Sequence, residues 1–354
     1  MLVTIASCCQ GILPGMKISA AALPPVLSFK RRELLGPVID DVLLIGEYAG
    51  VGTAYKMIGA RVEAAEAKEN PLKDMPRVKL QRSFVMVPGW TTNLERFEAL
   101  GRHLTKGGLN GGTIHFIKDG QFYFDRNCTR PRDASSISKE ARVFEVLFND
   151  PHDPPPEMKA QLTRNFAAIS AITGENKLDV DAYSMGGLGT RLYLDEGGDK
   201  VGRLMLLGSP AKGSRFADLS RQILERDIKW AIDMGGLKVA DLPALTWLSV
   251  DDGKGINNPH LTELNANWSR QKANLEAVVA VGGGGVVTPK PGLINVGAGD
   301  GLVPVGHLAP PGETAVVVDG LTHHGYLNSN PKVFQEMQKF FGWQPVDSQE
   351  TGPR

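Results

Sequence analysis

The sequence predicts an α/β fold: a mostly parallel central sheet with flanking helices and an inserted helical cap. From about residue 82, short apolar runs bounded by turn residues alternate with segments of helical periodicity, as in β–α units built on a parallel sheet. This alternation stops between about residues 211 and 287, where helical segments and a loop follow one another. A chain of 354 residues has room for one such domain with an insertion.

We expect three regions along the chain. Residues 1–80 form an N-terminal extension with a helix over about Val42–Lys68, because its last third is rich in Ala and Glu. This helix packs on the main domain or, as the alternative, contacts a membrane surface or a partner. Residues 81–345 form the α/β domain, with the cap at about 211–287, and residues 346–354 form a polar tail.

The expected elements follow in chain order. The strands are short apolar runs: Phe84–Val87, Thr113–Ile117, Leu178–Tyr183, Val201–Leu207, Gly292–Val296 and Ala315–Val318. The helices are segments with apolar residues at helical spacing: Leu94–Leu104, Pro156–Thr173, Gly186–Leu194, Phe216–Met234 and Pro331–Phe341. Within the cap, Leu242–Leu248 is a short apolar segment, and the run Gly282–Gly285 predicts a flexible joint that returns the chain to the sheet.

Composition and charge exclude several classes of function. Lys and Arg number 39, as do Asp and Glu, so no excess charge would hold a polyanion or an anionic bilayer, and we expect no nucleic-acid partner. Hydrophobic residues at 42% and charged residues at 22% are typical of a soluble globular protein. Three cysteines, two of them adjacent, give no disulfide framework.

We expect no secretory signal or membrane-spanning segment, with a bacterial lipoprotein cleavage box at Ile5-Ala6-Ser7-Cys8 as the alternative. The start, Met1–Ala6, lacks the basic region of a secretory signal, which favours a cytoplasmic location. The longest apolar candidate, Leu34–Ile58, is interrupted by Asp40, Asp41 and Glu47 and falls short of the roughly 20 apolar residues that a bilayer requires. We therefore expect no transmembrane helix.

The strongest catalytic motif is Ala182-Tyr183-Ser184-Met185-Gly186, where a buried strand is followed by a helix. A serine on such a sharp turn has a strained backbone that holds Oγ toward the substrate, and small residues two before and two after it let strand and helix approach. Ala182 stands where glycine is commoner. We predict that Ser184 is a nucleophile; the alternative is a chance match in an ordinary strand-to-helix turn.

A second glycine turn lies upstream, at Pro88-Gly89-Trp90, directly after the strand Phe84–Val87. The backbone N–H groups of Trp90 and Met185 could together bind the negative charge that develops on a tetrahedral intermediate. We predict that they form the oxyanion hole, although the turn could also simply end the strand.

The acid and the base of a triad are expected near the C-terminus. Asp300 follows a predicted strand between glycines and is our candidate for orienting an imidazole; Asp319 and Asp218 are the alternatives. The base should come after the strand Ala315–Val318. Two adjacent histidines stand there, and we favour His323 over His324 because the spacing His, any residue, Gly, large apolar, Leu matches the catalytic histidine turn of many lipases.

In this order, Ser then Asp then His, the chain over about residues 82–342 resembles the bacterial lipase and esterase branch of the α/β-hydrolases. Two secondary motifs are similar to that branch: Leu207-Gly208-Ser209-Pro210-Ala211-Lys212-Gly213-Ser214 with Ala217-Asp218, and Pro259-His260-Leu261-Thr262-Glu263-Leu264-Asn265. Ala211 departs from the pattern, because a histidine usually follows that proline. The N-terminal extension has no counterpart in the branch.

The resemblance implies an α/β-hydrolase fold and serine-dependent hydrolysis of lipid or other acyl esters through an acyl-enzyme on Ser184. It implies no cofactor, and the histidines show no metal-ligand spacing. One alternative is an acyltransferase or thioesterase with the same triad; another is an inactive, hydrolase-like binding module. We expect a small-molecule or lipid ester as ligand. The sequence allows peripheral contact with a membrane and does not indicate an oligomeric state.

Apolar side chains in the predicted cap suggest an acyl-chain pocket, although they could equally pack on the sheet. They are Trp230, Ile232, Met234, Leu237, Leu245, Trp247 and Leu248.

Overall fold

The computed structural model describes residues 44, 47–48, 72–90, 92, 94–228, 232, 237–251, 257–289, 296–323 and 330–346. Most of the helix expected over Val42–Lys68 lies outside these residues, as do the tail from residue 347 and the expected strand Gly292–Val296 up to its last residue.

The core of the molecule is a sheet of nine strands in the order β12-β9-β8-β7-β2-β6-β3-β4-β5. In chain order these strands are β2 (Phe84–Val87), β3 (His115–Lys118), β4 (Gln121–Tyr123), β5 (Pro131–Arg132), β6 (Val143–Leu147), β7 (Leu178–Tyr183), β8 (Val201–Leu207), β9 (Ala277–Gly284) and β12 (Ala315–Asp319). All neighbours from β12 to β3 pair in parallel, and β4 and β5 add an antiparallel edge.

Two small antiparallel pairs lie outside this sheet: β1 (Val78–Lys79) with β13 (Gln344–Pro345), and β10 (Val286–Pro289) with β11 (Val296–Gly299). The helices are α3 (Leu94–Thr105), α4 (Pro155–Thr173), α5 (Met185–Asp195), α6 (Arg215–Glu225), α8 (Leu242–Leu248), α9 (Pro259–Ala266), α10 (Trp268–Lys272) and α11 (Pro331–Phe341). The predicted fold class, a mostly parallel sheet with flanking helices, is confirmed.

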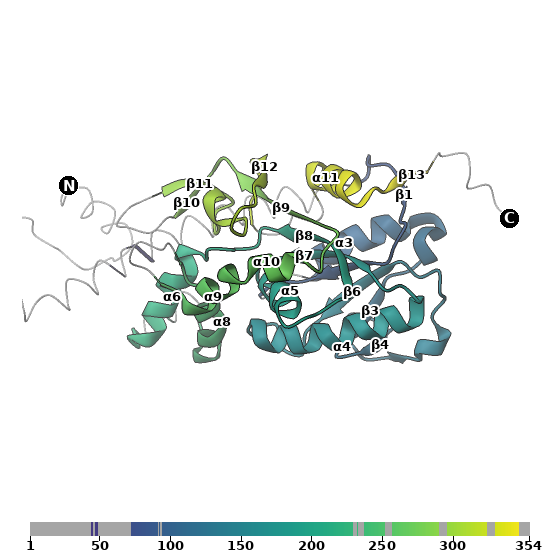
Figure 1. Ribbon diagram of the computed structural model, residues 1–354, viewed down its shortest axis with the longest axis horizontal. Helices are drawn as coiled ribbons and strands as arrows, with labels where there is room; N and C mark the ends of the chain where they lie inside the picture. Colours follow the sequence, from purple (N-terminus) through teal and green to yellow (C-terminus); the bar gives the residue numbers. More distant parts are fainter. Residues whose placement is uncertain are drawn as a thin grey trace, which may run out of the picture.

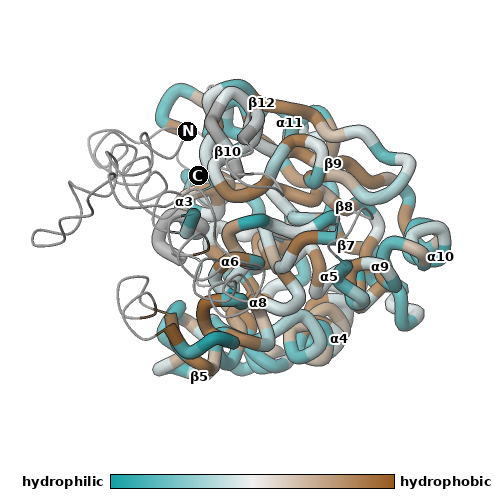
Figure 2. The backbone as a smooth tube through the Cα atoms, turned by 90° about the vertical axis from the view of Figure 1, so that its left-hand side faces the viewer, coloured by the Kyte–Doolittle hydropathy of each residue, from teal (hydrophilic) through white to brown (hydrophobic). Residues whose placement is uncertain are grey.

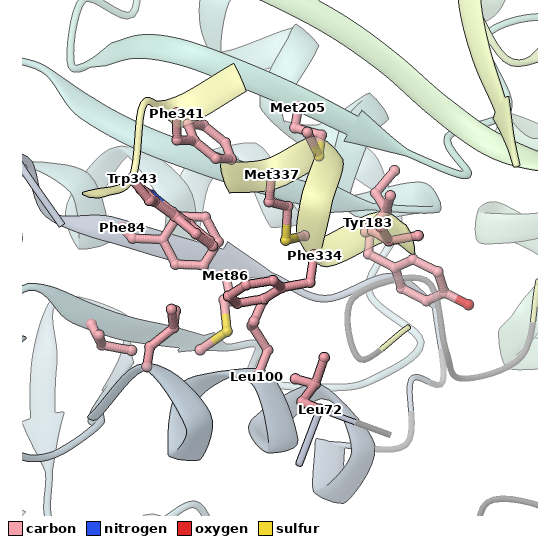
Figure 3. Close-up of a cluster of buried hydrophobic side chains, with 14 of the residues drawn as sticks. Leu72, Phe84, Met86, Leu100, Tyr183, Met205, Phe334, Met337, Phe341 and Trp343 are labelled. Carbon is pink, nitrogen blue, oxygen red and sulfur yellow. The ribbon is translucent and has the colours of Figure 1, made fainter. Parts of the chain in front are cut away.

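Helices cover both faces of the sheet (Figure 1), and hydrophobic residues are frequent along its strands (Figure 2). In β2, Phe84 and Met86 point toward α3 and α11, whereas Val85 and Val87 point toward α4 and α5. Figure 3 shows the first of these clusters, with Phe334 of α11 beside Met86. Because strand side chains alternate between faces, a continuous apolar run such as Phe84–Val87 is buried on both sides.

The helices α6, α8 and α9 gather at one end of the sheet (Figure 1). Their apolar faces form one cluster with α4 and α5, so this region packs on the helix that follows Ser184. The range expected for the cap, 211–287, also includes β9, which belongs to the central sheet.

Two sequence expectations in this region were wrong. The run Gly282–Gly285 does not form a flexible joint, because Gly282, Gly283 and Gly284 end β9 and pair in parallel with β12. The helix expected over Phe216–Met234 ends at Glu225, and Asp227 just after it has a left-handed φ of 49°.

Three described residues of the N-terminal extension, Leu44, Glu47 and Tyr48, contact α6. Leu44 and Tyr48 are buried against Leu219 and Ile223 of that helix. Glu47 receives two hydrogen bonds from the guanidinium of Arg215, at 3.0 and 2.9 Å. No helix in the described part of the chain combines the length and the apolar character that crossing a bilayer requires.

Candidate active site

Ser184 lies at the sharp turn between β7 and α5, with φ 51° and ψ −125°. A non-glycine residue with this φ is strained, which is typical of a serine held for chemistry. The turn needs glycine two residues later, because a Cβ on Gly186 would lie 2.3 Å from the carbonyl oxygen of Pro88. Ala182, at the position where glycine is commoner, is fully buried.

The turn after β2 packs directly on this serine. A Cβ on Gly89 would lie 2.7 Å from Cβ of Ser184 and 3.3 Å from the backbone nitrogen of Met185. The turn is held by a 2.8 Å hydrogen bond from the N–H of Gly89 to Oγ1 of Thr92. Neither the N–H group of Trp90 nor that of Met185 donates a hydrogen bond to another residue in the part of the chain that the structure describes.

Asp300 follows β11 and is 1% exposed. Its Oδ1 accepts hydrogen bonds from the backbone N–H groups of Leu302 at 2.9 Å and Val303 at 2.7 Å. These bonds fix the carboxylate, because both donors lie in the same tight turn. Its other oxygen, Oδ2, is left to face His323.

His323 joins the acid to the serine. Its Nδ1 lies 2.8 Å from Oδ2 of Asp300, and its Nε2 lies 2.9 Å from Oγ of Ser184. Its backbone N–H also donates to the carbonyl oxygen of Asp300 at 2.7 Å. With Nδ1–H donating to the carboxylate, Nε2 is the acceptor for the serine hydroxyl. The structure thus brings the three side chains predicted from the sequence into one buried hydrogen-bonded chain.

Gly283 makes room for the loops that carry Asp300 and His323. A Cβ on this residue of β9 would lie 2.7 Å from Cβ of Asp300 and 2.0 Å from the carbonyl oxygen of Leu321. The glycine run that suggested a flexible joint therefore permits close packing beneath the site.

The alternative acids and bases lie elsewhere. Asp218 forms ion pairs with Arg215 and Arg221 within α6. Asp319 is exposed at the end of β12, and His324 lies outside the described residues.

The five other histidines have structural partners. His103 contacts the carbonyl of Pro76, His115 contacts Arg132, His152 contacts Asp241, His260 stacks on Trp247, and His307 contacts the carbonyl of Gly213. No group of three potential metal ligands occurs within the part of the chain that the structure describes.

A parallel sheet, a strained serine between its strand and the next helix, and the chain order Ser, Asp, His are features of one architecture. The chain has an α/β-hydrolase fold. The structure of the lin2722 gene product of Listeria innocua is similar, with 17% identity, a TM-score of 0.47, and coverage of 77% of this chain and 97% of the other. The structure of the mature Bacillus licheniformis lipase BlEst2 is also similar, with 16% identity and a TM-score of 0.48. The match covers 76% of this chain and 94% of the lipase chain. The sequence matches no protein-family model and has no significant match among curated proteins.

Apolar side chains from α8 and its surroundings lie in one cluster with the elbow residues Met185 and Leu188. The cluster includes the following residues that the sequence suggested for an acyl pocket: Ile232, Leu237, Leu245, Trp247 and Leu248. Trp230 and Met234 lie outside the described residues. Trp90 packs against the same cluster and reaches the ring of His152.

Sequence reasoning missed several supporting contacts. Asn265 accepts a hydrogen bond from Arg191 at 3.0 Å and donates one to the carbonyl of Ala211 at 2.9 Å. The segment after β8, where Ala211 replaces the usual histidine, is thus bound to Asn265 of α9 through its main-chain carbonyl. Ser214 likewise donates to the carbonyl of Leu302 beside Asp300. Main-chain acceptors leave no residue-type signal in a sequence.

Proposed function

We propose that this protein is a serine-dependent hydrolase of carboxylic esters, with Ser184, His323 and Asp300 as its catalytic triad. The observation that carries the proposal is the buried hydrogen-bonded chain from Oγ of Ser184 through His323 to Asp300. The strained φ of Ser184 supports it, because such a turn presents Oγ to a substrate.

In the proposed reaction, Oγ of Ser184 attacks the carbonyl carbon of the ester while Nε2 of His323 takes the hydroxyl proton. The carbonyl π electrons move to oxygen, and the resulting oxyanion receives hydrogen bonds from the N–H groups of Trp90 and Met185. The tetrahedral intermediate collapses, the bond to the alcohol oxygen breaks, and His323 gives its proton to the leaving alcohol. Asp300 stabilises the imidazolium between the two transfers.

Water then completes the cycle. His323 takes a proton from water as the water oxygen attacks the acyl-enzyme, and it returns that proton to Oγ of Ser184 as the acid leaves. Every proton is moved by a group of the chain itself, so this mechanism requires no cofactor.

The acyl part of the substrate is proposed to be apolar. Partly buried apolar side chains, among them Trp90, Leu242 and Trp247, border the buried cluster that contains Met185. An aliphatic chain placed against such side chains gains about 0.8 kcal/mol per buried methylene group. This favours lipid or other acyl esters over esters of small polar acids.

Hydrolysis of p-nitrophenyl esters from acetyl to palmitoyl by the purified protein tests the proposal. Ser184→Ala should lose activity by about 10³-fold or more, and Ser170→Ala, which changes a serine of α4 outside the candidate site, should retain it. Wild-type protein that releases no p-nitrophenol from any ester would contradict the proposal and leave an inactive binding module. Analysis of the acyl product in the presence of alcohols or with thioester substrates separates hydrolysis from acyl transfer and thioester cleavage.

A further inference from the structure

We propose that Tyr183 is a positioning residue for His323, acting through a hydrogen bond from its phenol hydroxyl to the main-chain carbonyl of the histidine. This role rests on the proposed function, because it concerns the base of that reaction. The sequence pattern pointed to Tyr183 only as the variable residue of the serine motif.

The hydroxyl of Tyr183 donates to the carbonyl oxygen of His323, and the two rings lie 5.3 Å apart with an angle of 34° between them. Tyr183 belongs to the cluster on the α3 and α11 side of the sheet, with Met205 and Leu207. Figure 3 shows it at the edge of that cluster, with its hydroxyl pointing away from the other labelled side chains. The ring is thus packed in the core while its polar end reaches the site.

His323 is held at three points besides its contact with the nucleophile. Two of them, the Nδ1 contact and the backbone N–H bond, go to Asp300 in the loop after β11. The third comes from Tyr183, which directly precedes Ser184 on β7. Among these three bonds, which join described residues, the one from Tyr183 ties His323 to the strand that carries the nucleophile.

This arrangement fixes the distance over which the proton moves. Without the phenol bond, the turn containing His323 remains attached to the acid but loses its link to the serine strand. A displacement of about 1 Å between a nucleophile and its base costs on the order of 10²-fold in rate. The bond therefore supports the chemical step, and it does not touch the substrate.

The competing explanation is that Tyr183 is only a core aromatic. Phenylalanine would then serve equally well, because the ring packing is retained and only the hydroxyl is lost. Tyr193 on α5 provides a matched control, because it is 5% exposed and Tyr183 is 7% exposed. The hydroxyl of Tyr193 accepts a 3.0 Å hydrogen bond from the backbone N–H of Lys200. Each residue loses a hydrogen bond between its hydroxyl and the main chain when it is changed to Phe.

The test compares Tyr183→Phe and Tyr193→Phe in the full-length protein, with kcat and KM for p-nitrophenyl butyrate and the rate of fluorophosphonate labelling. Tyr183→Phe should lower kcat and the labelling rate together by about tenfold or more, with KM within about twofold. Tyr193→Phe should leave all three within about twofold. Equal losses in both variants, or no loss in Tyr183→Phe, would overturn the positioning role.

A second readout does not depend on turnover. The proton NMR signal of the Nδ1–H of His323 reports its hydrogen bond to Asp300, so Tyr183→Phe should shift or broaden this signal and Tyr193→Phe should not. An unchanged signal in Tyr183→Phe would overturn the proposal even if that variant is destabilised. Wild-type protein that neither turns over nor labels would instead overturn the proposed function, and the positioning role with it.

Discussion

Gly89 packs directly against Ser184: a Cβ atom built on this glycine lies 2.7 Å from Cβ of the serine. The contact joins the turn after β2 to the turn after β7, which are neighbouring parallel strands. The carboxyl ends of such strands share one edge of the sheet, and this is why segments almost 100 residues apart form one site.

Gly89→Ala should damage catalysis more than folding. The added methyl group must displace Ser184 or the backbone of Met185, so we expect kcat/KM to fall by about 10²-fold, as for a misplaced reacting group. Steady-state kinetics with p-nitrophenyl butyrate measures the effect. Gly306→Ala is the control, because a Cβ there meets no atom within 4 Å; equal kinetics for the two variants would contradict the predicted crowding.

Asp300→Asn should lower kcat by about 10³- to 10⁴-fold with little change in KM, because an amide no longer selects the tautomer or stabilises the imidazolium. The same change at Asp319, which is exposed at the end of β12, should have an effect within about twofold. A large loss in Asp319→Asn together with an active Asp300→Asn would assign the acid to Asp319 instead.

Arg191 is a buried cation that ties α5 to α9 and α10. It is fully buried and donates to the side chains of Gln271 and Asn265 and to the carbonyl of Leu264. Arg191→Met removes the donor to the side-chain oxygens of Gln271 and Asn265, whereas the carbonyl of Leu264 keeps its bond from Nε2 of Gln271. The free energy of unfolding in urea should therefore fall by about 3 kcal/mol. Arg270→Met removes an exposed ion pair with Asp195 and should cost about 0.5 kcal/mol or less.

The stability of the fold should decrease in mild acid because of His115. Burial, aided by the guanidinium of Arg132, lowers the pKa of this imidazole from 6.5 to about 4. The folded protein keeps it neutral, whereas the unfolded chain binds a proton as the pH falls below about 6.5. Its stabilising contribution is therefore complete above that pH and is lost progressively toward pH 4.

His115→Gln removes this titration. Between pH 7 and pH 5, the wild-type free energy of unfolding should fall by about 2 kcal/mol more than that of the variant. Urea unfolding at the two pH values measures the difference, and parallel losses in both proteins would show that His115 is not the group responsible.

The ion pair between Glu47 and Arg215 should help to hold Glu47 and its neighbours Leu44 and Tyr48 on α6. Both side chains are 12% exposed, and the guanidinium binds both carboxylate oxygens. A double-mutant cycle with Glu47→Gln and Arg215→Gln should give a coupling energy of about 1 kcal/mol or more. The exposed pair Arg82 and Glu276 should give about 0.5 kcal/mol or less. A coupling energy at Glu47 and Arg215 no larger than this would contradict the anchoring role of their ion pair.

Much of the sheet could be predicted because most residues of its strands are apolar and buried. The runs Phe84–Val87, Leu178–Tyr183 and Val201–Leu207 were predicted with the bounds that the structure has. The strand β9 was missed because its last residues are glycines, which indicate flexibility in a sequence. Tertiary packing requires glycine at position 283, because a side chain there would collide with the loops that carry Asp300 and His323.

The candidate site followed from the sequence where chemistry requires a particular residue type. A nucleophile, an acid and a base each need a side chain of defined class after a strand, and Ser184, Asp300 and His323 have that pattern. The contact between Tyr183 and His323 could not be predicted, because its acceptor is a main-chain carbonyl 140 residues away. Such contacts depend on the fold and produce no characteristic residue spacing in the sequence.

Locating a covalent fluorophosphonate adduct by mass spectrometry tests the central claim, that Ser184 is the nucleophile, most directly. The account predicts one adduct per chain on the peptide that contains Ser184, no adduct in Ser184→Ala, and an unchanged adduct in Ser170→Ala. An adduct on a different serine, or labelling that persists in Ser184→Ala, would contradict it.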